Sequence, residues 1–325
     1  MVRVLHRHPT MRQAGDSEMT QPATQPEKTP SRPVRVRYPD WGFFVLLGLI
    51  GGSYVLLVVL MLAADLFYTE PSDFIESLQR PEIQYAVKLT MISCTIAAIM
   101  SLWVATPLGY LLSRFRFPGR WLVDTLIDIP VVLPPLVLGL SLLILFHLDI
   151  GGWQLERWLQ ETIRFTWPDW LYDMEWFKSR FNREFKFAVT YRVPAVILAQ
   201  FSVAAAFAVR TMRVTFDQIS PRAEDVARTL GCSRSQAFLQ IALPQSSRGM
   251  MAAFTIAWAR SLGEFGPILV FAGATRMRTE VLSTTVFLEL SIGNLEAAVA
   301  ISLIMVAMAM LVLVVLRMLG TEMRS

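Results

Sequence analysis

The sequence predicts an all-α, polytopic membrane protein with six transmembrane helices. Of its 325 residues, 54% are hydrophobic and 17% are charged, whereas a soluble domain carries about 25% charged residues. The mean hydropathy is +0.46. The apolar residues gather in runs of roughly 20, the length at which a helix crosses ~30 Å of hydrocarbon. Arginine clusters fall in alternate loops between these runs, as expected of a chain that crosses the membrane repeatedly.

The six expected spans are residues 41–64, 84–112, 121–146, 193–209, 249–271 and 295–319. Pro107, near the end of the second span, predicts a kink. The third span contains "DIPVVLPPLVLGL", in which Pro130, Pro134 and Pro135 must interrupt helical hydrogen bonding. Backbone groups freed at membrane depth need partners inside protein or along a wet cavity. The break therefore indicates either a helix that faces a pathway or a kink that serves only packing.

Positive charge places both termini in the cytoplasm. The segment before the first span ends in "SRPVRVRYPD", the loop after the second span holds Arg114, Arg116 and Arg120, and the loop after the fourth span and the C-terminus also carry Arg. Cytoplasmic loops carry the excess of Lys and Arg, and the loop after the first span is acidic. Residues 1–40 lack an apolar signal-peptide core. We therefore expect a disordered cytoplasmic tail over residues 1–40 and a membrane domain over residues 41–325.

The external loop over residues 147–192 is unusually rich in aromatic side chains and holds five of the nine Trp. Leu155, Trp158, Leu159 and Ile163 recur at helical spacing with charges between them. Trp and Tyr favour the membrane–water interface. This pattern predicts one or two amphipathic helices on the outer leaflet, serving either as a structural collar or as a docking surface for an external partner.

A polar segment, "SPRAEDVARTLGCSRSQAFLQIALPQ", lies in the cytoplasmic loop over residues 217–245. Ser220 followed by Pro221 predicts a helix N-cap and first helical residue. Glu224 and Asp225 fall in the first turn, where the helix dipole favours acids. Gly231 predicts the C-terminal stop of this first short helix.

A second short helix is expected after this glycine. Ser233 and Gln236 have the spacing of a capping box, and Pro244 is expected to end the helix. Its apolar stripe is formed by Ala237, Phe238 and Ile241. Two short helices joined at a glycine corner make a rigid projection, which suits insertion into a groove on another protein.

The fifth expected span carries an ion pair in "AWARSLGEFGPILVFAG". Arg260 and Glu264 are four residues apart, so they share a helix face and can neutralise each other. An acid within a span is a functional candidate, and the alternative is a structural ion pair. We expect Glu264 to stabilise a bend at Gly263 and Gly266, which let the backbone approach the pathway closely.

No catalytic constellation is visible in the sequence. It contains no Gly-x-x-x-x-Gly-Lys loop, no His-Glu-x-x-His and no Gly-x-Ser-x-Gly. We therefore expect no catalytic residue, metal site or cofactor in this chain. Cys94 and Cys232 predict no disulfide. The net charge of +4 is explained by the cytoplasmic Arg bias, so no nucleic-acid partner is expected, while Arg276 and Arg278 are either anion-attracting or plain flanking charges.

Loop 217–245 resembles the cytoplasmic signature loop of ABC importer permeases, whose pattern is Glu-Ala-Ala, three residues, Gly, nine residues, Ile, any residue, Leu-Pro. Here Asp225 and Val226 replace the first Glu and Ala, and Glu224 precedes them. The residues that match at the family spacing are Ala227, Gly231, Ile241, Leu243 and Pro244.

A second segment is similar to the fifth span of permeases for molybdate, tungstate and sulfate, which carry Ala-Arg-x-x-Gly-Glu-Phe-Gly. The corresponding residues are Ala259, Arg260, Ser261, Leu262, Gly263, Glu264, Phe265 and Gly266. The resemblance covers roughly residues 85–320, and the Trp-rich external loop exceeds the usual length of the family.

These resemblances imply a small ABC importer permease of a bacterial inner membrane that moves an oxyanion into the cytoplasm, with molybdate or tungstate favoured over sulfate. The implied partners are ABC ATPase subunits, an external solute-binding protein and a second permease copy. The implied ATPase-docking residues are Glu224, Asp225, Ala227, Gly231, Ile241, Leu243 and Pro244. The implied pathway residues are Arg260, Gly263, Glu264, Phe265 and Gly266. Alternatives are a similar permease for a metal ion or polyamine, a stand-alone channel or carrier, and a membrane enzyme.

Overall fold

The computed structural model describes residues 41–68, 71–166, 184–186 and 188–322. The expected tail over residues 1–40 and much of the Trp-rich loop lie outside the described residues. The chain divides into two compact units, Met1–Leu56 and Leu57–Ser325. We describe the second unit, which contains every candidate site.

Helices dominate the described residues, which confirms the all-α class. The helices are α1 (Trp41–Tyr68), α2 (Pro71–Gln79), α3 (Pro81–Arg114), α4 (Arg120–Val132), α5 (Pro135–His147), α6 (Leu155–Thr162), α9 (Val193–Gln218), α10 (Arg222–Thr229), α11 (Arg234–Ala237), the π-helix η1 (Phe238–Ala242), α12 (Leu243–Gln245), α13 (Ser247–Leu262), α14 (Gly266–Phe271), α15 (Leu282–Ile292) and α16 (Leu295–Glu322). The strands form two short antiparallel hairpins, β1 (Asp149–Ile150) with β2 (Trp153–Gln154) and β3 (Arg164–Thr166) with β4 (Glu184–Lys186).

The structure does not confirm six spans. Among the described residues, four helices are long and apolar enough to cross a membrane, namely α1, α3, α9 and the Leu295–Leu316 part of α16. A fifth span arises if α4 and α5, which are bent by 114° relative to each other, count as one broken helix. The expected span over residues 249–271 is divided into α13 and α14, of 16 and 6 residues, because its Gly-Glu-Phe segment leaves helical geometry.

Proline accounts for the break between α4 and α5. The last hydrogen bond of α4 runs from Leu133 N to Ile129 O at 2.9 Å, and Pro134 and Pro135 then supply no N–H with which to continue the ladder. The predicted interruption is therefore confirmed at these two residues. Pro107 and Pro130, by contrast, lie inside α3 and α4.

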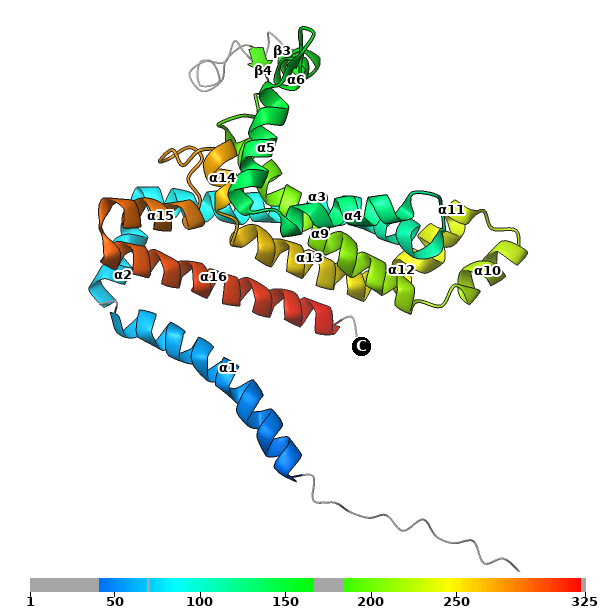
Figure 1. Ribbon diagram of the computed structural model, residues 1–325, viewed down its shortest axis with the longest axis horizontal. Coiled ribbons are helices and arrows are strands. Elements are labelled where there is room, and N and C mark those ends of the chain that lie inside the picture. The colour runs from blue at the N-terminus through cyan, green and yellow to red at the C-terminus, as the bar shows by residue number, and fades with distance from the viewer. Residues whose placement is uncertain (1–40, 69–70, 167–183, 187, 323–325) are drawn as a thin grey trace, which may run out of the picture. The chain divides into compact units, whose positions relative to one another are not determined.

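The core of the unit forms where α3 packs along α9 and α13 packs against both (Figure 1). The buried side chains there are mostly small, including Ala98, Ala105, Ala204, Ala208, Ala253 and Ala257. At Gly109 on α3 an added Cβ would lie 2.8 Å from Cβ of Met212 on α9. Small residues let helix backbones approach closely within a membrane, where apolar burial alone does not drive helices together.

The two broken regions contact each other, because α5 packs against α14 (Figure 1). An added Cβ at Gly266 would lie 2.8 Å from Cβ of Pro135, and one at Gly139 would lie 2.8 Å from Cα of Pro267. Each glycine therefore meets a proline of the other helix. Gly266 thus approaches the backbone of α5 closely, whereas an added Cβ at Gly263 would find its nearest atom at 3.9 Å; the expected approach of both glycines to a pathway stays a prediction.

The Trp-rich loop over residues 147–192 contains one of the expected amphipathic helices among its described residues. Leu155 and Leu159 of α6 pack against the core cluster near Phe146, whereas Trp158 is 46% exposed. The Glu156 carboxylate accepts hydrogen bonds from the backbone N–H groups of Val189 and Thr190. The helix is thus attached to the membrane domain itself.

The glycine contact between α14 and α5 predicts a difference between two alanine substitutions. Gly266→Ala should lower the stability of the protein by about 1–3 kcal/mol, because the new methyl group overpacks against Pro135. Gly263→Ala is the matched control, since its Cβ would find its nearest atom, Arg260 O, at 3.9 Å. Thermal unfolding of both variants in the same detergent checks the prediction, and equal melting temperatures would contradict it.

Candidate functional site

The first helix of loop 217–245 begins one residue later than expected. Pro221 occupies the N-cap position, and the Ser220 hydroxyl accepts a 3.4 Å hydrogen bond from Arg222 N. The predicted stop at Gly231 is confirmed. This residue has φ +96°, in the region that favours glycine, and its N–H donates to Arg228 O at 3.1 Å.

The start of the second helix is as predicted, but its end is not. Gln236 N donates to the Ser233 hydroxyl at 3.2 Å, and Ser233 N donates to Oε1 of Gln236 at 2.8 Å, which completes the capping box. Pro244 does not end the helix, because it lies inside α12 directly after the π-helix η1. A proline ring collides with the carbonyl four residues earlier in a regular α-helix, and the wider π turn relieves such a conflict.

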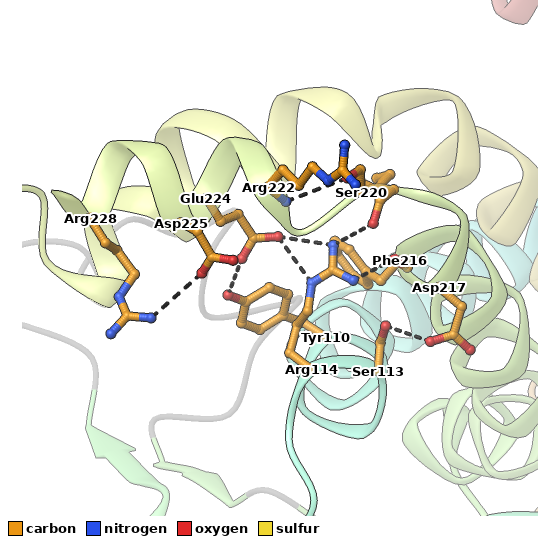
Figure 2. A network of polar contacts seen from close by, with 11 residues as sticks. Tyr110, Ser113, Arg114, Phe216, Asp217, Ser220, Arg222, Glu224, Asp225 and Arg228 are labelled. Carbon is orange, nitrogen blue, oxygen red and sulfur yellow. Dashed lines mark hydrogen bonds and ion pairs between the residues drawn. The ribbon is translucent and has the colours of Figure 1, made fainter. Parts of the chain in front are cut away.

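Two adjacent acids of α10 face different surroundings (Figure 2). The Glu224 side chain is 8% exposed and forms a 2.9 Å ion pair with Arg114 at the end of α3, while the hydroxyl of Tyr110 donates to its other oxygen at 2.6 Å. Asp225 is 67% exposed and has a looser 3.8 Å contact with Arg228. One acid therefore attaches the loop to its own domain, and the other is available to solvent or a partner.

Two of the three residues in the predicted apolar stripe of the second helix, Ala237 and Phe238, face their own domain. Ala237 is buried, and the ring of Phe238 lies 4.6 Å from that of Tyr110, so the stripe packs onto its own domain. The exposed apolar side chains of the loop are instead Val226, Leu230 and Leu239. Of the predicted docking residues, Glu224 and Ala227 are buried, Ile241 and Leu243 are partly buried, and Asp225, Gly231 and Pro244 are exposed.

The expected pair in the fifth span forms, and it sits at the helix break. Arg260 Nη2 lies 3.1 Å from Oε1 of Glu264; Arg260 belongs to α13, whereas Glu264 follows its end. The Ser283 hydroxyl donates to the backbone oxygen of Glu264 at 2.8 Å. The Glu264 side chain is buried, while the Arg260 side chain is 47% exposed and lies 4.8 Å above the Phe207 ring.

Two more polar groups occupy the segment before α15. Arg276 forms a 2.8 Å ion pair with Glu289, so its charge is compensated within the domain. Glu280 is 1% exposed, and neither of its carboxylate oxygens has a hydrogen-bond partner among the described residues. Burial raises the pKa of Glu280, which favours the neutral carboxyl. Within the described residues, no group of three or more His, Cys, Asp or Glu is placed to hold a metal ion.

Sequence reasoning missed Arg114, Tyr110 and Glu280 as site residues. Arg114 counted only toward membrane orientation, because it is 110 residues from Glu224 in the chain. Neither Tyr110 nor Glu280 belongs to a spacing pattern. One signal in the sequence could have indicated an ion pair. A carboxylate that becomes buried needs a positively charged or hydrogen-bonding partner, so Glu224 on an amphipathic helix called for one.

Comparison with known proteins identifies a family and several relatives of this chain. Residues 105–325 match the family of the binding-protein-dependent transport system inner membrane component. The chain is 32% identical to the sulfate transport system permease protein CysT of Escherichia coli, over 73% of this chain and 76% of that protein. It is 28% identical to the molybdate/tungstate transport system permease protein WtpB of Thermococcus kodakarensis, over 82% and 92% of the two chains.

A solved structure supports the fold. A bacterial ABC transporter involved in the import of the acidic polysaccharide alginate matches with a TM-score of 0.62 and 18% identity, covering 88% of this chain and 97% of that chain. The family match spans more than half of the chain, and the sulfate permease relative exceeds 30% identity. The protein therefore belongs to the binding-protein-dependent inner-membrane permeases of ABC importers, in the oxyanion group that includes the sulfate and molybdate/tungstate permeases.

Proposed function

We propose that this chain is the membrane-spanning subunit of an importer that moves a tetrahedral oxyanion into the cytoplasm, powered by a separate ATPase that docks on loop 217–245. The observation that carries this proposal is the two-sided α10, on which Glu224 is buried against Arg114 while neighbouring Asp225 is exposed. One side of the helix is attached to the spans, and the other is open to a partner.

The exposed side of the loop has the chemistry of a docking face. Val226 and Leu230 are 58% and 81% exposed, and Leu230 lies directly before the glycine corner. Exposed apolar side chains on a short helix suit the groove of a partner protein. We infer that the docked ATPase closes and opens with its nucleotide and moves these helices, so that the spans alternate between inward and outward access.

The proposed cargo is a tetrahedral oxyanion delivered by an external solute-binding protein. Relatives bear the names of sulfate and of molybdate/tungstate permeases, so they support the oxyanion class and do not separate its members. Our preference for molybdate or tungstate stays a prediction. We further propose a homodimer of this chain, with both termini in the cytoplasm, as the arginine-rich loops predict.

Arg260 is the proposed anion-facing group of the pathway, together with Gly263, Glu264, Phe265 and Gly266 around the helix break. Its guanidinium is half exposed, and buried Glu264 holds one side of it. A cation at membrane depth attracts an anion, and a paired carboxylate keeps that cation from binding it too tightly. Phe265, whose ring lies 5.0 Å from that of Phe287, packs the other side of the break.

The docking face predicts that Leu230→Asp prevents ATPase binding. The new charge would be buried in an apolar contact, so recovery of the ATPase with the purified permease should fall by at least about tenfold. Leu230→Met is the control and should retain binding. Recovery of an unchanged amount of ATPase with the Asp variant would place the docking surface elsewhere.

The pathway assignment predicts separate effects on transport and on protein level. Arg260→Gln should raise the anion concentration for half-maximal uptake about tenfold, since a charge-assisted contact is lost, whereas Arg260→Lys should retain most uptake. Glu264→Ala should reduce uptake more than the amount of protein in the membrane. Radiolabelled anion uptake and immunoblots measure both quantities, and a parallel loss of both would indicate a purely structural ion pair.

The cargo is tested by deleting the gene for this chain in its host and measuring cellular molybdenum, tungsten and sulfur by elemental mass spectrometry. Cells are supplied with trace molybdate and tungstate, and with sulfate as the only sulfur source. Loss of molybdenum or tungsten alone assigns those anions. Loss of sulfur assigns sulfate, and unchanged content of all three elements contradicts the oxyanion proposal.

A further inference from the structure

Arg114, the last residue of α3, joins three separate elements through one buried guanidinium (Figure 2). Its Nε and Nη2 contact Oε1 of Glu224 on α10 at 3.0 and 2.9 Å. Its Nη1 and Nη2 donate to Phe216 O and Ile219 O, both at 2.9 Å, at the end of α9. The side chain is only 12% exposed. Carbonyl groups at the end of a helix lack helical partners, and the guanidinium binds two of them here, although Phe216 O also accepts from Ile219 N at 3.2 Å.

Tyr110 occupies the second oxygen of the same carboxylate. It lies one helical turn before Arg114 on α3, so both side chains point from the same face. Its hydroxyl donates to Oε2 of Glu224 at 2.6 Å, and its ring lies 5.4 Å from that of Phe216. Both oxygens of the Glu224 carboxylate are thus bound from α3.

The rest of α10 adds little packing to this attachment. Glu224 and Ala227 are the buried residues of the helix. A cavity of about 290 Å³ opens beside the ion pair and is lined by Arg114, Glu224, Arg228 and Arg234, among others. α10 also packs on α11 and η1, and the polar bonds of Glu224 connect it directly to α3.

We propose that Arg114, positioned with Tyr110, is the joint through which displacement of α10 by the ATPase is transmitted to α3 and α9. This inference rests on the proposed ATPase docking and specifies where the movement enters the membrane domain. A displaced α10 must either carry α3 and α9 with it or separate a desolvated ion pair, and separation is unfavourable because it leaves buried charges without partners. Asp225, exposed on the same helix, lacks this connection.

The test uses the complete transporter, purified with its ATPase and reconstituted in vesicles. The cargo-loaded binding protein is added on the side of the membrane opposite the ATPase. The measured quantity is the ratio of ATP hydrolysis with the loaded binding protein to hydrolysis without it. Arg114→Gln should lower this ratio toward 1 while the ATPase is recovered with the permease in wild-type amounts. Tyr110→Phe, which removes a single hydroxyl, should lower the ratio by a smaller factor and serves if the Arg114 variant does not fold.

A conservative variant and a matched ion pair complete the design. Arg114→Lys keeps the charge, but one ammonium group cannot reproduce the planar fork that spans a carboxylate and two carbonyls, so its ratio should lie between those of Gln and wild type. Asp128→Asn is the control, because the Asp128–Arg210 pair at 2.7 Å links α4 to α9 without touching the loop; its ratio should match that of wild type.

The outcomes separate the joint from the proposed function. A wild-type permease that recovers no ATPase overturns the proposed docking and the joint with it. A coupled wild type with unchanged ratios in Arg114→Gln and Tyr110→Phe overturns the joint alone. A ratio that falls only in parallel with ATPase recovery also overturns it, since Arg114 would then merely maintain the docking face.

Discussion

The close packing of α3 against α9 is the contact on which the rest of the domain depends. Apolar burial does not hold helices together in lipid, so the pair relies on small side chains and on near approach of backbones, as at Gly109 and Met212. With α3 held in this position, residues in both halves of the helix contact other elements. Thr90 accepts a 3.0 Å hydrogen bond from the N-terminus of α15 at Leu282, and Arg114 joins the end of α9 at the other end.

The interrupted helices obey a second constraint, because nonhelical backbone at membrane depth must be covered by protein. The break between α4 and α5 and the break between α13 and α14 meet, with Gly266 against Pro135 and Gly139 against Pro267. The free carbonyl of Glu264 is satisfied by Ser283. Each break alone would expose backbone polar groups to lipid, and placing the two together covers them with protein. The half-exposed guanidinium of Arg260 lies at the break between α13 and α14.

Loop 217–245 combines a rigid shape with a polar attachment. Gly231 and the Ser233 capping box define its two helices locally, whereas its position on the domain is set by Glu224 with Arg114 and Tyr110. In the family pattern, Asp225 occupies the position of the usual Glu. In the structure Asp225 is exposed, whereas the adjacent Glu224 is buried. An attachment made of directional hydrogen bonds holds α10 in one orientation relative to α3.

The sequence by itself determined the features that arise from local physics. These are the all-α class, most long apolar helices, the break at Pro134 and Pro135, the glycine corner at Gly231 and the capping box at Ser233. It also contained the family pattern. Only the tertiary structure decided that Gly266 meets Pro135, that Ala237 and Phe238 face inward, and that Glu224 binds Arg114. The reason is that these outcomes depend on partners far away in the chain, and hydropathy or capping rules describe only neighbours in sequence.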